Sequence, residues 1–231
     1  MRATIPIEAV IFDIDGTLVD SVDLHAESWR LAFKEFGKTV PLPEIRRQIG
    51  KGADQLMPVF WSKDELKKIG PRLKEYRSEL FKKDFLPQVK PFPGVRTLFK
   101  RVMRDGKRIA LASSAQGDEL EAYKKIAGID DLIKAETSSD DAEKSKPHAD
   151  IFEAALGKLE GMTPDRVIVV GDTPYDAEAA AKAGLRTLGL RSGGWKESDL
   201  RRAGCIAVYR DTADLLEHYE ASPLHAPLGE V

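Results

Sequence analysis

The chain has 231 residues, 42% of them hydrophobic and 32% charged, which suits one large globular domain or a core with an insertion. Its 36 basic and 38 acidic residues give a formal charge of −2, which argues against nucleic acid or a membrane surface as a partner. The single cysteine excludes an intrachain disulfide, and no run approaches the about 20 apolar residues of a membrane helix. Without a signal-peptide pattern, the expected location is the cytoplasm.

The first predicted strand, Ala9–Phe12, runs directly into two carboxylates, Asp13 and Asp15. Its residues are apolar throughout, as expected of a strand that is covered on both faces. By itself, Asp-x-Asp-Gly is most often a turn, because aspartate and glycine both favour turns. Two acids that repel each other at the end of a buried strand nevertheless suggest that a positive charge lies between them.

From Ser21 to about Lys90 the pattern is helical throughout, without a convincing strand. The stretch "SVDLHAESWRLAFKEFG" has a capping serine and a glycine stop, and "SKDELKKIGPRLKEYRSELFKKDFL" is long, charged and amphipathic. A proline-rich stretch then ends the helical segment. We therefore predict an all-helical domain, residues 21–90, inserted after the first strand of a core formed by residues 1–20 and 91–231.

Beyond the helical insert, apolar runs alternate with helical stretches such as "GVRTLFKRVMRDG" and "HADIFEAALGKL". The further predicted strands are Ile109–Ala112, Val167–Val170, Leu185–Leu190 and Cys205–Tyr209. This alternation predicts an α/β fold, a doubly wound parallel sheet of the Rossmann-like kind, beside the small all-helical domain. Cys205 lies in an apolar run, which indicates a buried structural thiol.

Polar residues come directly after three of these strands. They are Asp13, Asp15, Ser113, Ser114 and Asp172, and Asp176 follows four residues after the last of them. In α/β sheets, ligands bind beyond the carboxyl ends of the strands. Several carboxylates can share such a place only around a cation, and oxygen ligands without Cys or His favour Mg²⁺. A carboxylate beside a bound phosphate could then attack phosphorus and form an aspartyl phosphate.

The segments "DIDGT", "SS" after a strand, "KP" before a helix and "GDTPYD" resemble the four motifs of the haloacid dehalogenase superfamily, in its phosphatase branch. They stand in the family's order over residues 13 to 176, and the helical insert resembles the family's small cap domain. The members it looks most like are phosphoglycolate phosphatases and beta-phosphoglucomutases. Each motif is weak alone, whereas the ordered set is specific.

The resemblance implies a role for each matching residue. Asp13 would be the nucleophile and a Mg²⁺ ligand, and Asp15 would protonate the leaving group and then deprotonate the attacking water. The main-chain carbonyl of Asp15 would also bind the metal. Lys146 would neutralise the nucleophile and the phosphate, and Asp172 would complete the metal site. Asp176 would hold the metal's water or the lysine.

Ser113 would hydrogen-bond the phosphoryl group, with Ser114 beside it in substrate binding. Ser113 stands where many family members carry threonine, which also supplies a hydroxyl. Ser145 precedes Lys146 where glycine is common, and Lys144 is a nearby competitor, but Pro147 favours Lys146.

Each of these residues also has a plainer interpretation. Asp172 could be a helix cap, Asp176 a solvated helix residue, and Ser113 a group that only satisfies the end of a strand. Lys146 lies in the charged stretch "DDAEKSKPHAD", where most lysines are solvated. Taken together and in order, the motifs favour the catalytic interpretation over the plain one.

Two groups of cap residues are candidates for substrate contact. His25 and Trp29 lie one turn apart, at offsets where related mutases carry the same residues, although His25 could line the hinge and Trp29 could simply pack. The stretch "IRRQIGKG" resembles the cap loop of phosphoglycolate phosphatases. It offers Arg46, Arg47 and Lys51 to an anionic substrate, but it could equally be a helix end with ordinary surface bases.

Four functions fit the motifs to different degrees. A Mg²⁺-dependent phosphatase acting on a small phosphate monoester, phosphoglycolate above all, fits best, with the cap closing over the substrate. A sugar-phosphate mutase is supported by His25 and Trp29, but Gly171 stands where a beta-phosphoglucomutase has a second acid. A haloacid dehalogenase needs neither a metal nor a second aspartate, so Asp15 and Asp172 argue against it. A non-enzymatic binding module is disfavoured because no catalytic position is missing.

Overall fold

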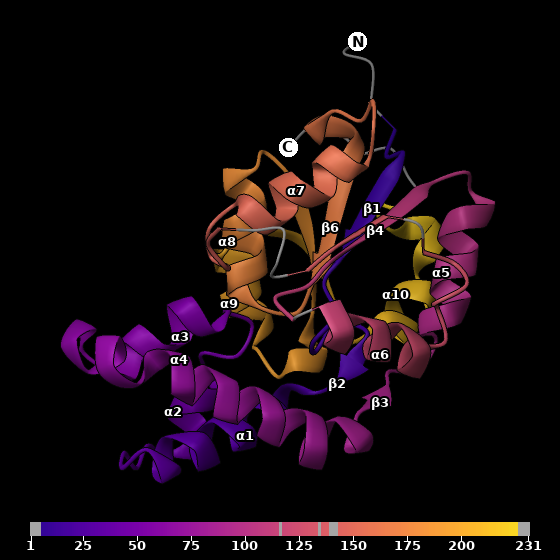
Figure 1. Cartoon of the computed structure of the whole chain (residues 1–231). Coiled ribbons are helices and arrows are strands. Elements are labelled where there is room, and N and C mark those ends of the chain that lie inside the picture. Colours follow the sequence, from indigo (N-terminus) through magenta and orange to yellow (C-terminus); the bar gives the residue numbers. More distant parts are fainter. Residues whose placement is uncertain (1–5, 116, 134, 139–142, 226–231) are drawn as a thin grey trace.

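The computed structural model describes residues 6–115, 117–133, 135–138 and 143–225. Within them, six strands form one parallel sheet in the order β5-β4-β1-β6-β7-β8. The strands are β1 (Ala9–Phe12), β4 (Arg108–Ala112), β5 (Ala135–Thr137), β6 (Val167–Gly171), β7 (Arg186–Leu190) and β8 (Cys205–Tyr209). The first strand thus lies between β4 and β6, and its carboxyl end points toward the helical insert (Figure 1).

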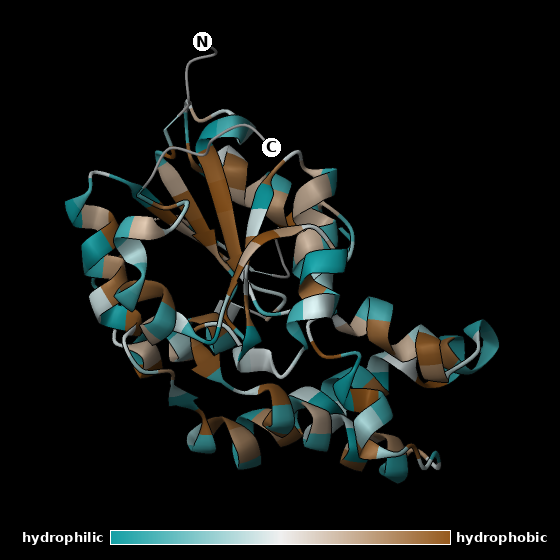
Figure 2. Ribbon diagram, turned by 180° about the vertical axis from the view of Figure 1, so that it is seen from behind, coloured by the Kyte–Doolittle hydropathy of each residue, from teal (hydrophilic) through white to brown (hydrophobic). Residues whose placement is uncertain are grey.

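Helices cover both faces of this sheet. One face carries α5 (Val95–Arg104), α6 (Gly117–Ala127) and α10 (Thr212–Glu217), and the other carries α7 (Asp150–Lys158) and α8 (Pro174–Lys182). Alternate residues of β1 divide between the two layers. Val10 and Phe12 pack with the first set of helices, and Ala9 and Ile11 pack with the second. Figure 2 shows hydrophobic strands inside the core and hydrophilic residues on the outer helix surfaces. The predicted doubly wound α/β fold is confirmed.

The remaining elements lie at the edge of the sheet and near the end of the described chain. Helix α9 (Glu197–Arg202) packs on β7 and β8, where Leu200 contacts the buried Cys205. Short helical turns occupy Pro164–Arg166, Arg191–Gly193 and Tyr219–Ala221. In the part of the chain that the structure describes, we find no helix with the length and apolar character of a membrane span.

The insert between β1 and the rest of the sheet is helical. Its elements are α1 (Val22–Glu35), α2 (Leu42–Arg46), α3 (Ala53–Phe60), α4 (Lys63–Leu80), a π-helical turn (Phe81–Phe85) and a 3₁₀ turn (Leu86–Gln88). Trp29 and Phe33 of α1 pack with Leu56 of α3 and Leu73 of α4 in a hydrophobic cluster built within the insert. These helices lie across the carboxyl ends of the sheet strands, below the sheet in Figure 1.

Three short strands differ from the expectation. β2 (Val19–Asp20) and β3 (Lys90–Pro91) pair antiparallel and join the two ends of the insert, where we expected no strand. β5, with the sequence AET, extends the sheet beyond β4. Strands of two or three residues are too short to show a periodic or apolar pattern, and they are held by pairing with a partner from elsewhere in the chain.

Candidate active site

Residues from three separate places meet at the carboxyl end of β1. Asp13 follows β1, Asp172 follows β6, and Lys146 lies in the loop before α7. The ammonium group of Lys146 pairs with Asp13 and lies 2.7 Å from Asp176 Oδ1. The Thr17 hydroxyl lies 3.1 Å from Asp13 Oδ2 and 3.1 Å from Asp172 Oδ1. All five residues are buried.

The buried carboxylates outnumber the positive charges that surround them. Asp13, Asp172 and Asp176 each offer an oxygen, and these oxygens lie within 4.8 Å of one another, whereas Lys146 supplies one compensating charge. Burial raises the pKa of Asp13 to about 7, despite the attraction of Lys146. Burial and then the neighbouring acids raise the pKa of Asp172 well above its ordinary value. Such raised pKa values indicate that a cation in this place would stabilise the charged form of the carboxylates.

One oxygen of this cluster has no partner. Asp172 Oδ2 is buried and makes no hydrogen bond to any described residue. It lies against the backbone of Gly16 and Gly193, where an added Cβ would come within 2.3 Å and 1.7 Å of it. An unsatisfied buried carboxylate oxygen beside two further acids fits a hard divalent cation, which prefers oxygen ligands. The cluster could therefore hold a metal ion.

The side chain of Asp15 points away from these acids and toward the insert. Its Oδ1 accepts hydrogen bonds from Ser21 Oγ at 2.5 Å and from His25 Nε2 at 2.8 Å. Burial would raise the pKa of Asp15, but its interactions with His25 and Ser21 outweigh burial and lower the pKa to about 2. Asp15 is therefore ionised at neutral pH.

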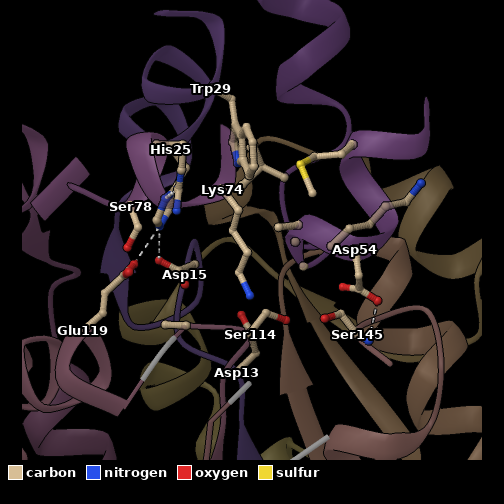
Figure 3. A pocket seen from close by; sticks show the side chains of 18 of the residues that line it. Asp13, Asp15, His25, Trp29, Asp54, Lys74, Ser78, Ser114, Glu119 and Ser145 are labelled. Atoms are coloured by element: carbon tan, nitrogen blue, oxygen red, sulfur yellow. Dashed lines mark hydrogen bonds and ion pairs between the residues drawn. The ribbon is translucent and has the colours of Figure 1, made fainter. Parts of the chain in front are cut away.

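A cavity of about 300 Å³ lies between the sheet edge and the insert. The core supplies Asp13, Asp15, Ser114, Glu119 and Ser145 to its walls, and the insert supplies His25, Trp29, Lys51, Met57, Lys74 and Arg77. Lys74 reaches from α4 toward Ser114 and Asp13 (Figure 3). The cavity thus joins the acidic cluster to a surface of the insert that carries both basic and apolar side chains.

The two predicted serines differ in their surroundings. Ser113 is fully buried, and its Oγ accepts a hydrogen bond from the backbone N–H of Ala115 at 3.0 Å. Ser114 lines the cavity, and its buried Oγ has no hydrogen-bond partner among the described residues. Of the two serines, Ser114 is the one that lines the cavity in this structure.

Arg46 and Arg47, which we expected to contact the substrate, are not among the residues that line the cavity in this structure. Arg46 binds Asp23 at 2.5 Å and the carbonyl of Gly193 at 3.2 Å, and the carbonyl of Arg47 accepts a hydrogen bond from Tyr175 at 2.6 Å. Both arginines lie where the insert touches the core.

Lys51, in contrast, lines the cavity, and its ammonium group lies 4.6 Å from the centre of the Tyr175 ring. His25 and Trp29 also line the cavity. Of the predicted insert residues, these three are therefore the ones that can face a bound molecule.

Several cavity residues were not predicted from the sequence. Lys74 and Arg77 belong to the charged face of α4, and Glu119 lies on α6, two helices without a recognisable motif. The three-residue spacing of Lys74 and Arg77 puts both on one side of a helix, which is the one signal the sequence contains. That signal does not tell a cavity-facing side from a solvated one.

Comparison with known proteins agrees with this arrangement. The profile of the haloacid dehalogenase-like hydrolase family matches residues 10–190. A phosphorylated carbohydrates phosphatase of Thermotoga maritima is 29% identical over 205 residues, which are 88% of this chain and 94% of that protein. A phosphoglycolate phosphatase of Cereibacter sphaeroides is 30% identical over 216 residues, which are 90% of this chain and 97% of that protein.

Comparison of the fold with solved structures also finds a hydrolase. The crystal structure of a hydrolase from Pseudomonas syringae matches with a TM-score of 0.81 and 27% identity, covering 92% of this chain and 98% of that chain. The family resemblance that the motifs indicated, and with it the prediction of an enzyme, is confirmed. The chain belongs to the haloacid dehalogenase-like hydrolase family.

Proposed function

We propose that the protein is a Mg²⁺-dependent phosphatase that hydrolyses a small phosphate monoester through an aspartyl phosphate on Asp13. The observation that carries the proposal is the buried cluster of Asp13, Asp172 and Asp176 at the base of a cavity, with Asp15 beside it. The phosphatase names of two relatives support it.

Asp13, Asp172 and the main-chain carbonyl of Asp15 are the groups that would hold Mg²⁺. When bound, the ion would offset the repulsion between the Asp13 carboxylate and an anionic phosphate. Asp176 has a supporting part, because its Oδ2 accepts hydrogen bonds from the N–H and the hydroxyl of Thr173 while its Oδ1 faces Lys146. Lys146 in turn holds Asp13 and would neutralise the phosphoryl oxygens.

The reaction has two steps. In the first, an oxygen of Asp13 forms a bond to phosphorus while the bond from phosphorus to the leaving oxygen breaks, and Asp15 gives that oxygen a proton. In the second, water attacks phosphorus, Asp15 takes a proton from the water, and the bond to Asp13 breaks to release phosphate. The low pKa of Asp15 suits the second step, and the charge of a bound phosphate would raise this pKa for the first.

Ser113 and Ser114 would bind the phosphoryl group after β4. The unpartnered hydroxyl of Ser114 can turn toward a bound phosphate without losing an existing bond. Ser113 accepts a hydrogen bond from the N–H of Ala115, and its own O–H can still donate to a phosphoryl oxygen.

Residues 21–90 would act as a cap domain over a core of residues 1–20 and 91–231. The hydrophobic cluster within the insert supports this division, since the insert can keep its own packing while it moves. The β2–β3 pair, which joins both connections, would serve as the hinge. Closure would exclude bulk water from the reacting groups.

The substrate would be small and its leaving group anionic, with phosphoglycolate as the leading candidate. The cavity volume of about 300 Å³ limits the size, and the cations of Lys51, Lys74 and Arg77 line its insert side. A mutase, the runner-up, is supported by the place of His25 and Trp29 in the cavity. It is disfavoured at Gly171, where even a Cβ would lie 2.6 Å from Asp176 Cβ and a second acid has no room.

A phosphate-release screen over small phosphate monoesters, with Mg²⁺ and with EDTA, tests the proposal. We expect release only with Mg²⁺, and a loss of several orders of magnitude in kcat for Asp13→Asn, because the nucleophile is removed. Asp20→Asn, at an exposed aspartate near the same strand, should keep its activity. Activity that survives in Asp13→Asn, or no release from any ester, would contradict the proposed function.

A further inference from the structure

Glu119 is a buried carboxylate that the proposed reaction does not use. It lies on α6 of the core and is 4% exposed. Its Oε1 accepts a hydrogen bond from the hydroxyl of Tyr123 at 2.7 Å, and that hydroxyl lies 2.9 Å from His25 Nε2 on the insert. His25 Nε2 in turn lies 2.8 Å from Asp15 Oδ1. A continuous chain of polar contacts therefore runs from the core, through the insert, to Asp15.

The neighbours of His25 determine where its proton lies. His25 Nδ1 contacts a guanidinium nitrogen of Arg77 on α4, and a guanidinium can only donate. Nδ1 is therefore an acceptor, and Nε2 carries the hydrogen that points to Asp15. The imidazole also stacks on Phe81, with ring centroids 4.0 Å apart and an interplanar angle of 9°. The ring is thus held from the insert side by Arg77 and Phe81.

Glu119 and Tyr123 hold the same ring from the core side. Burial first, and then the nearby charges of Asp15 and Glu119, raise the pKa of Tyr123 well above its ordinary value, so the phenol keeps its proton. That proton goes to Glu119, which leaves a lone pair of the phenol oxygen to face the N–H of His25, so the two acceptors Asp15 and Tyr123 share this one hydrogen. Tyr123 already lies within hydrogen-bonding reach of Asp15. Without Glu119, the phenol would donate there and compete with His25.

We propose that Glu119 and Tyr123 are positioning residues, which act through His25 to orient the carboxyl group of Asp15 toward the leaving oxygen of the substrate. The inference rests on the proposed phosphatase function. The chain of contacts joins the core helix α6 to α1 of the insert, so it is complete only while the insert lies against the core as it does here. Asp15 is therefore held for proton transfer in the same arrangement that encloses the substrate.

Leaving-group acidity separates this role from a purely structural one. An alkyl leaving group needs a proton from Asp15, whereas p-nitrophenolate departs well without one. The kcat/KM value covers the steps up to departure of the leaving group. Tyr123→Phe should therefore lower kcat/KM about tenfold for 2-phosphoglycolate, or for the alkyl phosphate that the screen selects, which is part of the roughly 10² to 10⁴ that general acid catalysis provides. For p-nitrophenyl phosphate the change should stay below about twofold.

Two sets of variants complete the design. Tyr219→Phe is the matched control, because Tyr219 is a buried tyrosine of the same hydrophobic cluster, away from the cavity, and it should leave both kcat/KM values unchanged. Glu119→Leu should reproduce the loss seen in Tyr123→Phe. Glu119→Gln keeps an oxygen acceptor for the phenol, so it should stay within about threefold of the wild type.

The outcomes distinguish the inference from the function on which it rests. If wild-type protein hydrolyses both esters and Asp15→Asn shows the dependence on the leaving group while Tyr123→Phe does not, the inference is wrong and the function stands. Equal losses on both esters in Tyr123→Phe would likewise overturn the inference, because they indicate a structural effect. If wild-type protein hydrolyses neither ester, the proposed function itself fails.

Discussion

At the residue scale, the central feature is a set of acids that share one buried place. Asp13, Asp172 and Asp176 lie around Lys146 without enough positive charge between them. Burial raises the pKa of Asp13 to about 7, above the ordinary aspartate value of 3.8. Folded protein therefore binds more protons than unfolded protein between about pH 4 and pH 7. Over this range, Asp13 makes the metal-free protein less stable as the pH rises.

Asp13→Asn should remove that penalty. In EDTA, the variant should have a higher Tm than the wild type at pH 7, and the difference should shrink toward pH 3, where Asp13 is mostly protonated in both states. Addition of 10 mM Mg²⁺, roughly a hundredfold excess over an assumed Kd, should stabilise the wild type by about 2.7 kcal/mol and the variant less, because the variant lacks a ligand. Calorimetric scans at the two pH values provide the measurement.

A second acidic group serves as the control for this prediction. Asp214, Glu217 and His218 also lie close together, but the group is at the surface. Glu217→Gln should leave both the pH dependence and the Mg²⁺ response of the Tm unchanged. A wild-type Tm that does not respond to Mg²⁺ would count against a metal site at Asp13.

At the scale of elements, the loop between α2 and α3 brings the insert into contact with the core. Gly52 comes next to Ser145, and an added Cβ would lie 2.0 Å from Ser145 Oγ. Beside it, the backbone N–H of Ser145 donates to Asp54 Oδ2 at 3.2 Å. Since Gly52 has a φ of −73° and a ψ of 168°, alanine fits its backbone conformation. Its substitution therefore acts through the contact and not through backbone strain.

Gly52→Ala should hold the loop away from the core and open the cavity. We expect kcat/KM for the screened phosphate ester to fall by roughly tenfold or more, since displacements of about 1 Å are costly in catalysis. The Tm should change little. Gly157→Ala is the control, because Gly157 lies in α7 with no atom within 4 Å of an added Cβ, and alanine there should add about 0.5–1 kcal/mol of stability. Unchanged kcat/KM in Gly52→Ala would mean that this contact does not govern closure.

At the scale of the whole molecule, Cys205 reports on the integrity of the fold. It lies on β8, buried beneath α9, and burial raises the pKa of its thiol to about 12. Because the thiolate is the reactive form, the folded protein should hardly react with iodoacetamide at pH 8. Urea should expose the thiol, and the fraction alkylated in short pulses should follow the loss of circular dichroism. Rapid alkylation of native protein would show that the β8 edge opens without global unfolding.

The sequence by itself determined the core of the fold and the chemical character of the site. Continuous apolar runs such as Ala9–Phe12 can be satisfied only by burial on both faces, so they indicate the parallel sheet without any knowledge of partners. The acids after β1 and β6 were identified by their position at strand ends, because parallel strands bring their carboxyl ends to one edge.

Only the tertiary structure decided which side chains face the cavity. The short strand β5 exists through its pairing with β4, and Arg46 turns to Asp23 and Gly193 where the sequence suggested a substrate. Lys74 and Tyr123 reach the site from helices whose patterns show only one polar and one apolar face. Contacts between residues far apart in the chain depend on how rigid elements pack, and the periodicity of one element does not contain the position of another.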